Sequence, residues 1–275
     1  MVATPAVHTL YHNPFSICSL MVRYTVALRG PARDKASEIP IQDQSVDIFH
    51  EEQLSEHFLR NINPKGQVPV LTSPTLGAPI ADSMDITRYL AKYYPAIIPA
   101  SYEKEINERL DALHALNYFS LSFPGRDYVA QGFKAAVQRR LDGDISQAYR
   151  DALQYKMGII ERDKIGGLKP GAPEAMDERA RNLMSDFERI LPKQASLQAG
   201  DGGQTSNGTT SSGPWLFGLT SPSALDAHLV VFVARMRDVG RANIIPETIS
   251  DYADRAMALP EWQAVMEGRK TMIEA

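Results

Sequence analysis

The sequence has little cysteine, no concentration of positive charge and no long apolar run, and each shortage argues against a class of protein. Cys18 is the only cysteine in 275 residues, which excludes an intramolecular disulfide and argues against a cysteine-based metal site. The formal net charge is -4 and no basic cluster with interleaved aromatic residues occurs, so we expect no nucleic acid as a partner. No stretch has the length and hydrophobicity of a membrane span, so we expect no membrane partner.

The rest of the composition is ordinary. Hydrophobic residues make up 44% of the chain and charged residues 23%, values typical of a soluble globular protein. Residues 1–8 lack the basic patch and apolar core of a secretory signal peptide, so we expect a cytoplasmic protein. The length is compatible with one large domain or two modest ones.

Apolar periodicity divides the chain into a mixed first part and a helical second part. The first part predicts strands at residues 7–11, within 39–49, at 70–72 and at 79–81, and helices at 15–30, 51–61 and 84–93. After a proline-bearing linker at 94–99 we find no strand pattern, and helices are predicted at 102–122, 128–141, 145–165, 174–191, 252–259 and 261–272. Residues 198–213, rich in Gly, Ser and Thr, are expected to form a flexible loop. Ser223 and Asp226 form a capping box before a further helix and are interpreted as folding residues.

The most informative stretch is 63–71, Asn-Pro-Lys-Gly-Gln-Val-Pro-Val-Leu. Pro69 removes a ladder donor and indicates a sheet edge or tight turn, and an X-Pro bond can be cis. Asp82 and Ser83 then begin a predicted helix, and both are good capping residues. A helix N-terminus offers free N–H groups and a positive dipole end, which suit a carboxylate. A bent strand edge beside such a helix start can hold a peptide by its backbone and its carboxylate.

These motifs resemble the glutathione S-transferase family, over about residues 7–94. The resemblance implies a thioredoxin-like α/β N-terminal domain at residues 1–95 and an all-α C-terminal domain at residues 100–275. It also implies glutathione as cofactor, a homodimer, and transfer of glutathione to a small electrophile, aromatic or conjugated, in detoxification or secondary metabolism.

Ser16 is the predicted catalytic residue, since it follows the first strand and begins the first helix. A thiol with a pKa near 8.5 is mostly protonated at neutral pH, whereas the thiolate is the nucleophile. A hydroxyl that donates to the sulfur, together with the helix dipole, stabilises the thiolate. Residues 16–23 resemble the zeta-type motif Ser-Ser-Cys with Val-Arg following, except that Ile17 replaces the second serine, which removes a possible second donor and argues against the isomerase activity of that branch. Tyr11 is the alternative donor.

The resemblance also implies how glutathione is held. Val68 would pair its backbone with the cysteinyl part beside a cis Pro69. Ser83 would hold the γ-glutamyl carboxylate and Asp82 would face the amino group. Gln53 would contact the glycyl end.

The acceptor substrate would lie between the domains, where Tyr118 and Arg126 are the predicted substrate-binding residues. An aromatic ring suits a flat apolar molecule, and an arginine can meet a developing oxyanion. Four neighbours could line the same wall or belong to the core: His114, Phe119, Phe123 and Tyr128.

Three other functions stay open at this point. Some relatives isomerise a double bond or eliminate water through a reversible glutathione adduct, and others bind without turnover as structural or regulatory proteins. A thiol–disulfide oxidoreductase would use Cys18, and glutathione would have to resolve its mixed disulfide because no second cysteine exists.

Overall fold

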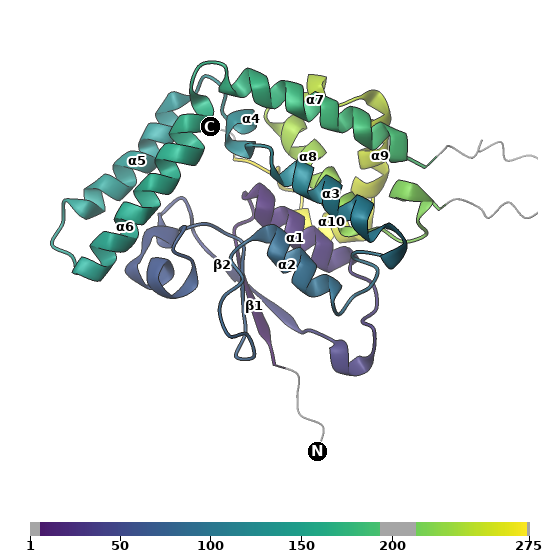
Figure 1. The fold of residues 1–275 in the computed structure, drawn as a ribbon, viewed down its shortest axis with the longest axis horizontal. Helices are drawn as coiled ribbons and strands as arrows, with labels where there is room; N and C mark the ends of the chain where they lie inside the picture. Colours follow the sequence, from purple (N-terminus) through teal and green to yellow (C-terminus); the bar gives the residue numbers. More distant parts are fainter. Residues whose placement is uncertain (1–5, 193–212, 274–275) are drawn as a thin grey trace, which may run out of the picture.

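The N-terminal half is built on a three-stranded sheet. The computed structural model describes residues 6–192 and 213–273, and the strands lie in the order β2-β1-β3 (Figure 1). β1 (His8–His12) pairs in parallel with β2 (Ile41–Ser45) and antiparallel with β3 (Val70–Thr72). Buried and half-buried side chains alternate along β1, as the two-residue period of a strand requires. The predicted loop at 198–213 lies, except for its last residue, outside the described residues.

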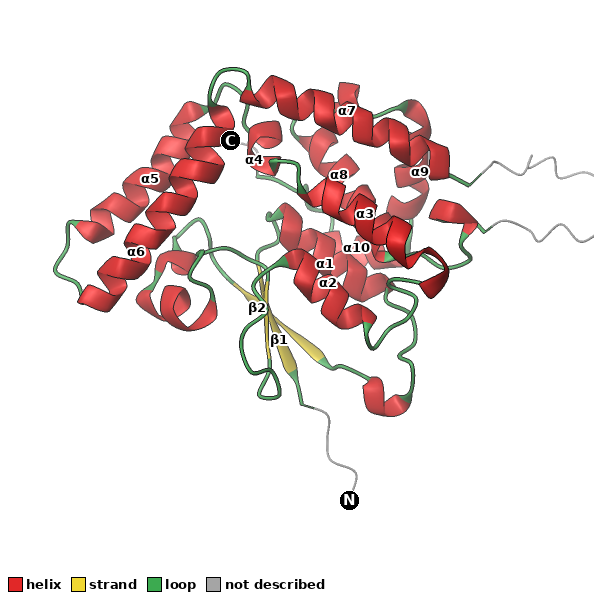
Figure 2. Cartoon of the chain, viewed as in Figure 1, coloured by secondary structure: helices red, strands yellow, loops and turns green. Residues whose placement is uncertain are grey.

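Helices surround the sheet and make up the second half (Figure 2). The N-terminal half has α1 (Ile17–Leu28) and α2 (Ser83–Ala91), with the short turns η1 (Lys35–Ser37), η2 (Glu52–Leu54) and η3 (Phe58–Ile62). The C-terminal half has α3 (Glu103–His114), α4 (Tyr118–Ser122), α5 (Asp127–Leu141), α6 (Gln147–Ile160), α7 (Ala172–Ile190), α8 (Ala224–Asp238), α9 (Glu247–Met257) and α10 (Pro260–Met266), with the turns η4 (Ala100–Tyr102), η5 (Glu161–Ile165), η6 (Gly166–Leu168), η7 (Leu216–Gly218) and η8 (Ala242–Ile244). This is the predicted arrangement of a thioredoxin-like domain followed by an all-helical domain.

Two predicted elements of the first half are shorter or broken. The strand expected at 79–81 is a single antiparallel bridge between Leu71 and Ile80, because Pro79 offers no N–H to the ladder. The helix expected at 51–61 is interrupted at Ser55, whose backbone is extended and whose hydroxyl accepts from the Phe58 N–H at 3.2 Å. Serine competes with the helix in this way when it caps a following turn.

Two predicted helices of the second half end early. The one expected at 102–122 breaks at Asn117, whose side chain caps α4 by accepting from the N–H groups of Phe119 and Ser120. The one expected at 261–272 ends at Met266, because Glu267 and Gly268 both have positive φ.

Helix α8 is the centre of the hydrophobic core. Every residue from Ala224 to Met236 is buried, and α1, α3 and α9 pack against this helix (Figure 1). The capping box of Ser223 and Asp226 is present at its start. α5 and α6 form a hairpin set apart from these helices, beside the η2–η3 segment (Figure 1).

Candidate functional site

The turn before α1 is shaped by Asn13. Its side-chain amide donates to the Val46 carbonyl at 2.9 Å, and its side-chain oxygen accepts from the Phe15 N–H at 2.9 Å. Asparagine stabilises turns through such local bonds. As a result, the chain passes from the end of β1 into α1 within a few residues, with Ser16 at the N-cap position.

Ser16 caps α1 and faces the bent strand edge. Its hydroxyl oxygen accepts from the Ser19 N–H at 3.3 Å, and the hydroxyl donates to the Val68 carbonyl at 3.3 Å. The Val68–Pro69 peptide bond is cis, which confirms that expectation. The structure therefore places the Ser16 hydroxyl beside the Val68 backbone, which was predicted to hold the cysteinyl part of glutathione.

Asp82 and Ser83 lie at the start of α2. Asp82 is the N-cap, and its Oδ1 atom accepts from the N–H groups of Met84 and Asp85, at 2.8 and 3.4 Å. Both bonds use one oxygen and Asp82 is exposed, so Oδ2 faces solvent. Ser83 is 5% exposed, and its hydroxyl lies 3.4 Å from the Nδ1 atom of His114.

Cys18 lies between the two helix starts, next to Ser83. Burial raises the pKa of its thiol to about 11, and the Ser83 hydroxyl opposes that rise. Since reactivity belongs to the thiolate, a thiol held neutral at physiological pH argues against the oxidoreductase alternative.

Comparison with known proteins identifies the fold. The sequence matches no model of a known protein family and no curated protein sequence. Among solved structures, the chain is similar to a glutathione transferase homologue from Sulfitobacter with bound glutathione, at 19% identity and TM-score 0.55, over 95% of this chain and 97% of that one. It is also similar to a mutant of poplar glutathione transferase F1, at 14% identity and TM-score 0.55, over 98% and 99%. A zeta-class bacterial maleyl pyruvate isomerase matches at 18% identity and TM-score 0.51, over 94% and 95%. The chain has the glutathione transferase fold.

Tyr118, one of the two predicted acceptor residues, is half-buried and packs against the main hydrophobic core at the start of α4. Its ring contacts those of His114 and Phe232, with centroids 5.9 and 6.2 Å apart. Its hydroxyl donates to the Leu113 carbonyl at 2.9 Å, and burial raises its pKa well above the usual value, with Cys18 adding to the shift. The ring can line an acceptor site, while the hydroxyl stabilises the break between α3 and α4.

Arg126 and Gln53 lie apart from this group. Arg126 occupies the N-cap position of α5 without a side-chain capping bond, and within the described part of the chain no hydrogen bond or ion pair joins it to Ser16, Ser83 or Tyr118. Gln53 is 5% exposed and its amide donates to the Ile48 carbonyl at 3.4 Å, while its Oε1 atom has no hydrogen-bond partner among the described residues. A contact between Gln53 and a ligand would require this side chain to turn outward.

Of the other predicted wall residues, Phe119 and Phe123 belong to the packing around α4 and α5, whereas Tyr128 is exposed and His114 lies beside Ser83 and Tyr118. The rings of Phe119 and Phe123 lie 4.8 Å apart, and the ammonium group of Lys164 lies 4.2 Å from the rings of both Phe119 and Phe133. Tyr128 is 66% exposed. Tyr11 packs edge-on against Phe58, in a cluster separate from the core that contains α1.

Lys156 and His228 are buried polar residues that were not predicted from the sequence. Lys156 is 3% exposed and donates to the carbonyls of Lys65 and Gly66 at 2.7 and 3.1 Å. Burial lowers its pKa to about 7, with the charge of Lys164 adding to the shift. His228 is fully buried on α8 and lies 2.8 Å from His114. The position of His228 inside the apolar run of α8 was the one sequence signal that could have indicated these buried polar groups.

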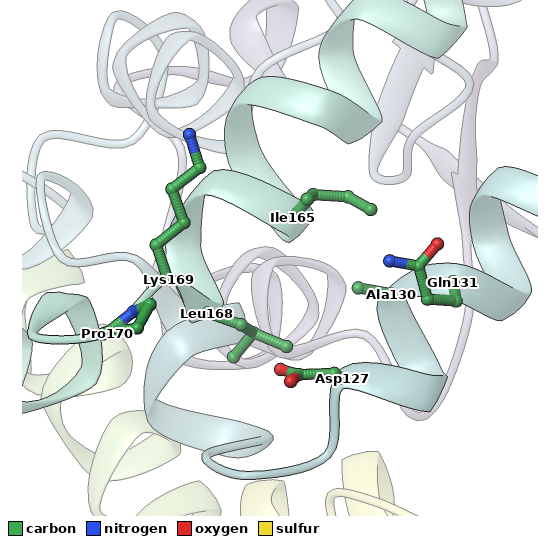
Figure 3. A pocket seen from close by; sticks show the side chains of 7 residues that line it. All are labelled: Asp127, Ala130, Gln131, Ile165, Leu168, Lys169 and Pro170. Carbon is green, nitrogen blue, oxygen red and sulfur yellow. The ribbon is translucent and has the colours of Figure 1, made fainter.

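A hollow of about 220 Å³ lies at the base of the α5–α6 hairpin, lined by Asp127, Ala130, Gln131, Ile165, Leu168, Lys169 and Pro170 (Figure 3). It contains none of the predicted site residues. Across residues 6–192 and 213–273, no group of three or more His, Cys, Asp or Glu side chains is placed to hold a metal ion. None of the described helices combines the length and apolar character of a membrane span.

Proposed function

We propose that the protein is a glutathione transferase-like enzyme in which Ser16 stabilises the glutathione thiolate for attack on a small electrophile. The observation that carries the proposal is the position of the Ser16 hydroxyl, which lies at the N-terminus of α1 and 3.3 Å from the Val68 carbonyl, beside the cis Pro69. The glutathione transferase fold supports the ligand class, because two solved structures of that fold contain glutathione.

Glutathione binding can free the Ser16 hydroxyl hydrogen to donate to the sulfur. Its hydroxyl hydrogen is given to the Val68 carbonyl, and that carbonyl suits the cysteinyl N–H of glutathione. Once the carbonyl has that partner, the Ser16 hydroxyl can turn toward the sulfur while its oxygen still accepts from the Ser19 N–H. Glutathione supplies the nucleophilic thiol.

The free energy required is modest. Lowering a thiol pKa by about two units requires about 2.7 kcal/mol. A hydrogen bond to a charged group contributes about 1.5–3 kcal/mol, and a helix N-terminus about 0.3–1 kcal/mol. Ser16 and the α1 dipole together are sufficient for that shift.

The γ-glutamyl end fits the start of α2. Ser83 presents its hydroxyl there, and the exposed Oδ2 atom of Asp82 can accept from an ammonium group. The electrophile would lie against the ring of Tyr118, and Arg126 would approach from the start of α5 only if that segment moved toward α1.

The proposal is tested by calorimetry of glutathione binding, with the ultraviolet absorbance of the bound thiolate followed against pH. We expect wild type and Ser16→Ala to bind glutathione, with the thiol pKa depressed in wild type alone and conjugation slowed about 100-fold in the variant. Tyr11→Phe is the matched control and should behave as wild type. A depressed thiol pKa in Ser16→Ala would refute the assignment of Ser16. No binding to wild type at millimolar concentration would refute the glutathione function.

A further inference from the structure

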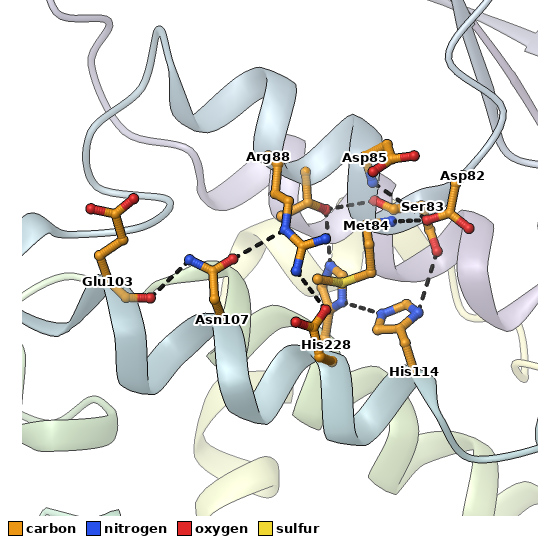
Figure 4. A network of polar contacts seen from close by, with 11 residues as sticks. Asp82, Ser83, Met84, Asp85, Arg88, Glu103, Asn107, His114 and His228 are labelled. Atoms are coloured by element: carbon orange, nitrogen blue, oxygen red, sulfur yellow. Dashed lines mark hydrogen bonds and ion pairs between the residues drawn. The ribbon is translucent and has the colours of Figure 1, made fainter.

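A closed ring of hydrogen bonds lies behind Ser83 (Figure 4). Its hydroxyl lies 3.4 Å from Nδ1 of His114, and Nε2 of His114 lies 2.8 Å from Nδ1 of His228. Nε2 of His228 lies 3.3 Å from the Thr87 hydroxyl, which lies 2.9 Å from the Ser83 carbonyl. Three elements contribute to the ring: α2, α3 and α8.

The direction of each hydrogen bond in the ring follows from the Ser83 carbonyl, which can only accept. A carbonyl oxygen only accepts, so the Thr87 hydroxyl gives its hydrogen to Ser83. His228 must then donate to Thr87 from Nε2, which leaves its Nδ1 atom as an acceptor. His114 donates to that atom from Nε2, so Nδ1 of His114 is the acceptor that faces Ser83. The Ser83 hydroxyl hydrogen therefore points at His114.

The surroundings keep both rings neutral when no ligand is present. Burial lowers the pKa of His114 to about 4, and Asp82 and Asp111 oppose that shift while Arg88 adds to it. Burial also lowers the pKa of His228, with His114 adding to the effect. The charged and titratable groups around His114 are Asp82 and Arg88 at α2, Asp111 on α3, Tyr118 on α4, His228 on α8 and, beside Ser83, Cys18 on α1.

The ring is held in place by a second contact between α2 and α3. Arg88 donates from Nε to the Asn107 side chain at 3.1 Å and forms an ion pair with Asp111 (Figure 4). Because Asp111 and His114 share one helix, this contact sets the distance between His114 and Ser83.

This arrangement conflicts with the binding of a carboxylate. If Ser83 holds the γ-glutamyl carboxylate, as the proposed function requires, its hydroxyl must donate to that anion. Its oxygen would then face the lone pair of His114 Nδ1 without a hydrogen between them, which leaves two buried acceptors in contact. A proton on Nδ1 removes the conflict, and the bound anion favours it.

We propose that His114 is a positioning residue for the γ-glutamyl end, and that binding of its carboxylate at Ser83 converts His114 Nδ1 from an acceptor into a protonated donor. The proton comes from solvent and no covalent bond changes. The inference rests on the proposed function and adds a measurable quantity, the number of protons taken up on binding.

The test is calorimetry with S-methylglutathione, which has no thiol proton to release, in two buffers of different ionisation enthalpy. For wild type at pH 5.5 we expect uptake of about half a proton or more, falling toward zero as the pH rises above 7. His114→Asn keeps an amide near the position of Nδ1 that can donate without titrating, so this variant should bind without uptake. His57→Asn, at an exposed histidine on the segment before η3, should keep the wild-type uptake.

The possible outcomes distinguish failure of the role of His114 from failure of the proposed glutathione function. Wild type that binds S-methylglutathione without proton uptake refutes the role of His114 and leaves the proposed function intact. Wild type that binds neither glutathione nor S-methylglutathione refutes the proposed function itself. If His114→Asn fails to fold, the ¹⁵N shifts of wild-type His114 decide. A protonated ring in the bound state supports the inference, and a neutral ring with reversed tautomer refutes it.

Discussion

Two of the contacts between the helical half and the sheet-bearing half differ in chemistry. At the first, α8 packs against α1 with its side chains buried all round, and the Tyr24 hydroxyl on α1 donates to the Ala256 carbonyl of α9 at 3.0 Å. At the second, the α5–α6 hairpin covers η2 and η3. Its apolar part is a small cluster of Leu54, Leu59, Ala136, Val137, Leu153 and Ile160.

The second contact depends on side chains that bind backbone. The Tyr149 hydroxyl donates to the Leu54 carbonyl at 2.5 Å, and Lys156 holds the carbonyls of Lys65 and Gly66. Gly66 has a φ of +56°, and a Cβ there would lie 3.0 Å from Leu59 and 3.1 Å from the Gln53 carbonyl. The turn η2 and the turn at Lys65 and Gly66 have carbonyls without sheet partners, and the hairpin supplies donors for them. The α8 contact depends mainly on packing, although Arg235 on α8 also donates to the Phe15 carbonyl at 2.7 Å. The hairpin contact has a smaller apolar cluster and depends more on directed polar bonds.

The largest expected effect lies at the start of α8. Asp226 is fully buried and accepts from the Ser223 N–H and hydroxyl, both at 2.6 Å, from the Leu216 N–H at 3.0 Å and from the Tyr252 hydroxyl. Asp226→Ala leaves these donors unpaired and should lower the free energy of unfolding by about 3–5 kcal/mol. Urea denaturation measures the loss. Asp251→Ala, at an exposed position of α9, should change stability by less than about 0.5 kcal/mol.

A cavity in the hairpin should have a smaller and more local effect. Leu153 is fully buried in the small cluster, so Leu153→Ala should cost about 2–4 kcal/mol. We expect hydrogen exchange to accelerate in α5, α6 and η2, with α8 still protected, because the hairpin has its own core. Leu229→Ala in α8 is the comparison and should accelerate exchange throughout. Equal acceleration of α8 by both variants would show that the two contacts unfold as one.

Between pH 7 and 9 the pH dependence of stability should come largely from the hairpin, because the lowered pKa values of His114 and His228 act below that range. The folded pKa of Lys156 is about 7 and that of Lys164 about 8, both lowered first by burial. Between pH 7 and 9 the unfolded chain therefore binds more protons, so stability rises with pH, by at most about 1.4 kcal/mol per unit for each lysine. Lys156→Met should flatten this rise, whereas Lys104→Met, on the exposed face of α3, should not. An unchanged slope in Lys156→Met would mean that Lys156 stays charged in the fold.

The same comparison explains what the sequence could predict. The sheet, α1, α2, the cis Pro69 and the capping box of α8 depend on local signals: alternation, caps and turn residues. Local chemistry also places Ser16 and Ser83 at helix starts, and the structure sets Ser16 beside Val68 and Ser83 beside His114. The roles of these residues in binding and catalysis stay predictions.

The hairpin contact could not be predicted from local signals. Lys156 and Lys164 look like ordinary surface lysines in the sequence, and only the tertiary fold buries Lys156 and half-buries Lys164 against the rings of Phe119 and Phe133. The hydroxyl of Tyr118 is likewise taken by the Leu113 carbonyl because α3 ends at His114, which the continuous apolar pattern at 102–122 did not indicate. Burial and partners, which decide the chemistry of such groups, are properties of the fold.

The smallest expected effect lies at the exposed edge of the hairpin. Glu51 receives a bond from Arg139 at 2.7 Å and an ion pair from Arg140, which is the less exposed of the two arginines. Partly exposed ion pairs contribute little, so a double-mutant cycle of Glu51→Ala and Arg140→Ala should give a coupling of about 0.5–1 kcal/mol. The cycle is needed because Glu51 has a φ of 62°, and its substitution also changes backbone strain, which the cycle cancels. The coupling should fall in about 1 M salt. A coupling that salt leaves unchanged would mean that this edge, like the α8 contact, is held by packing.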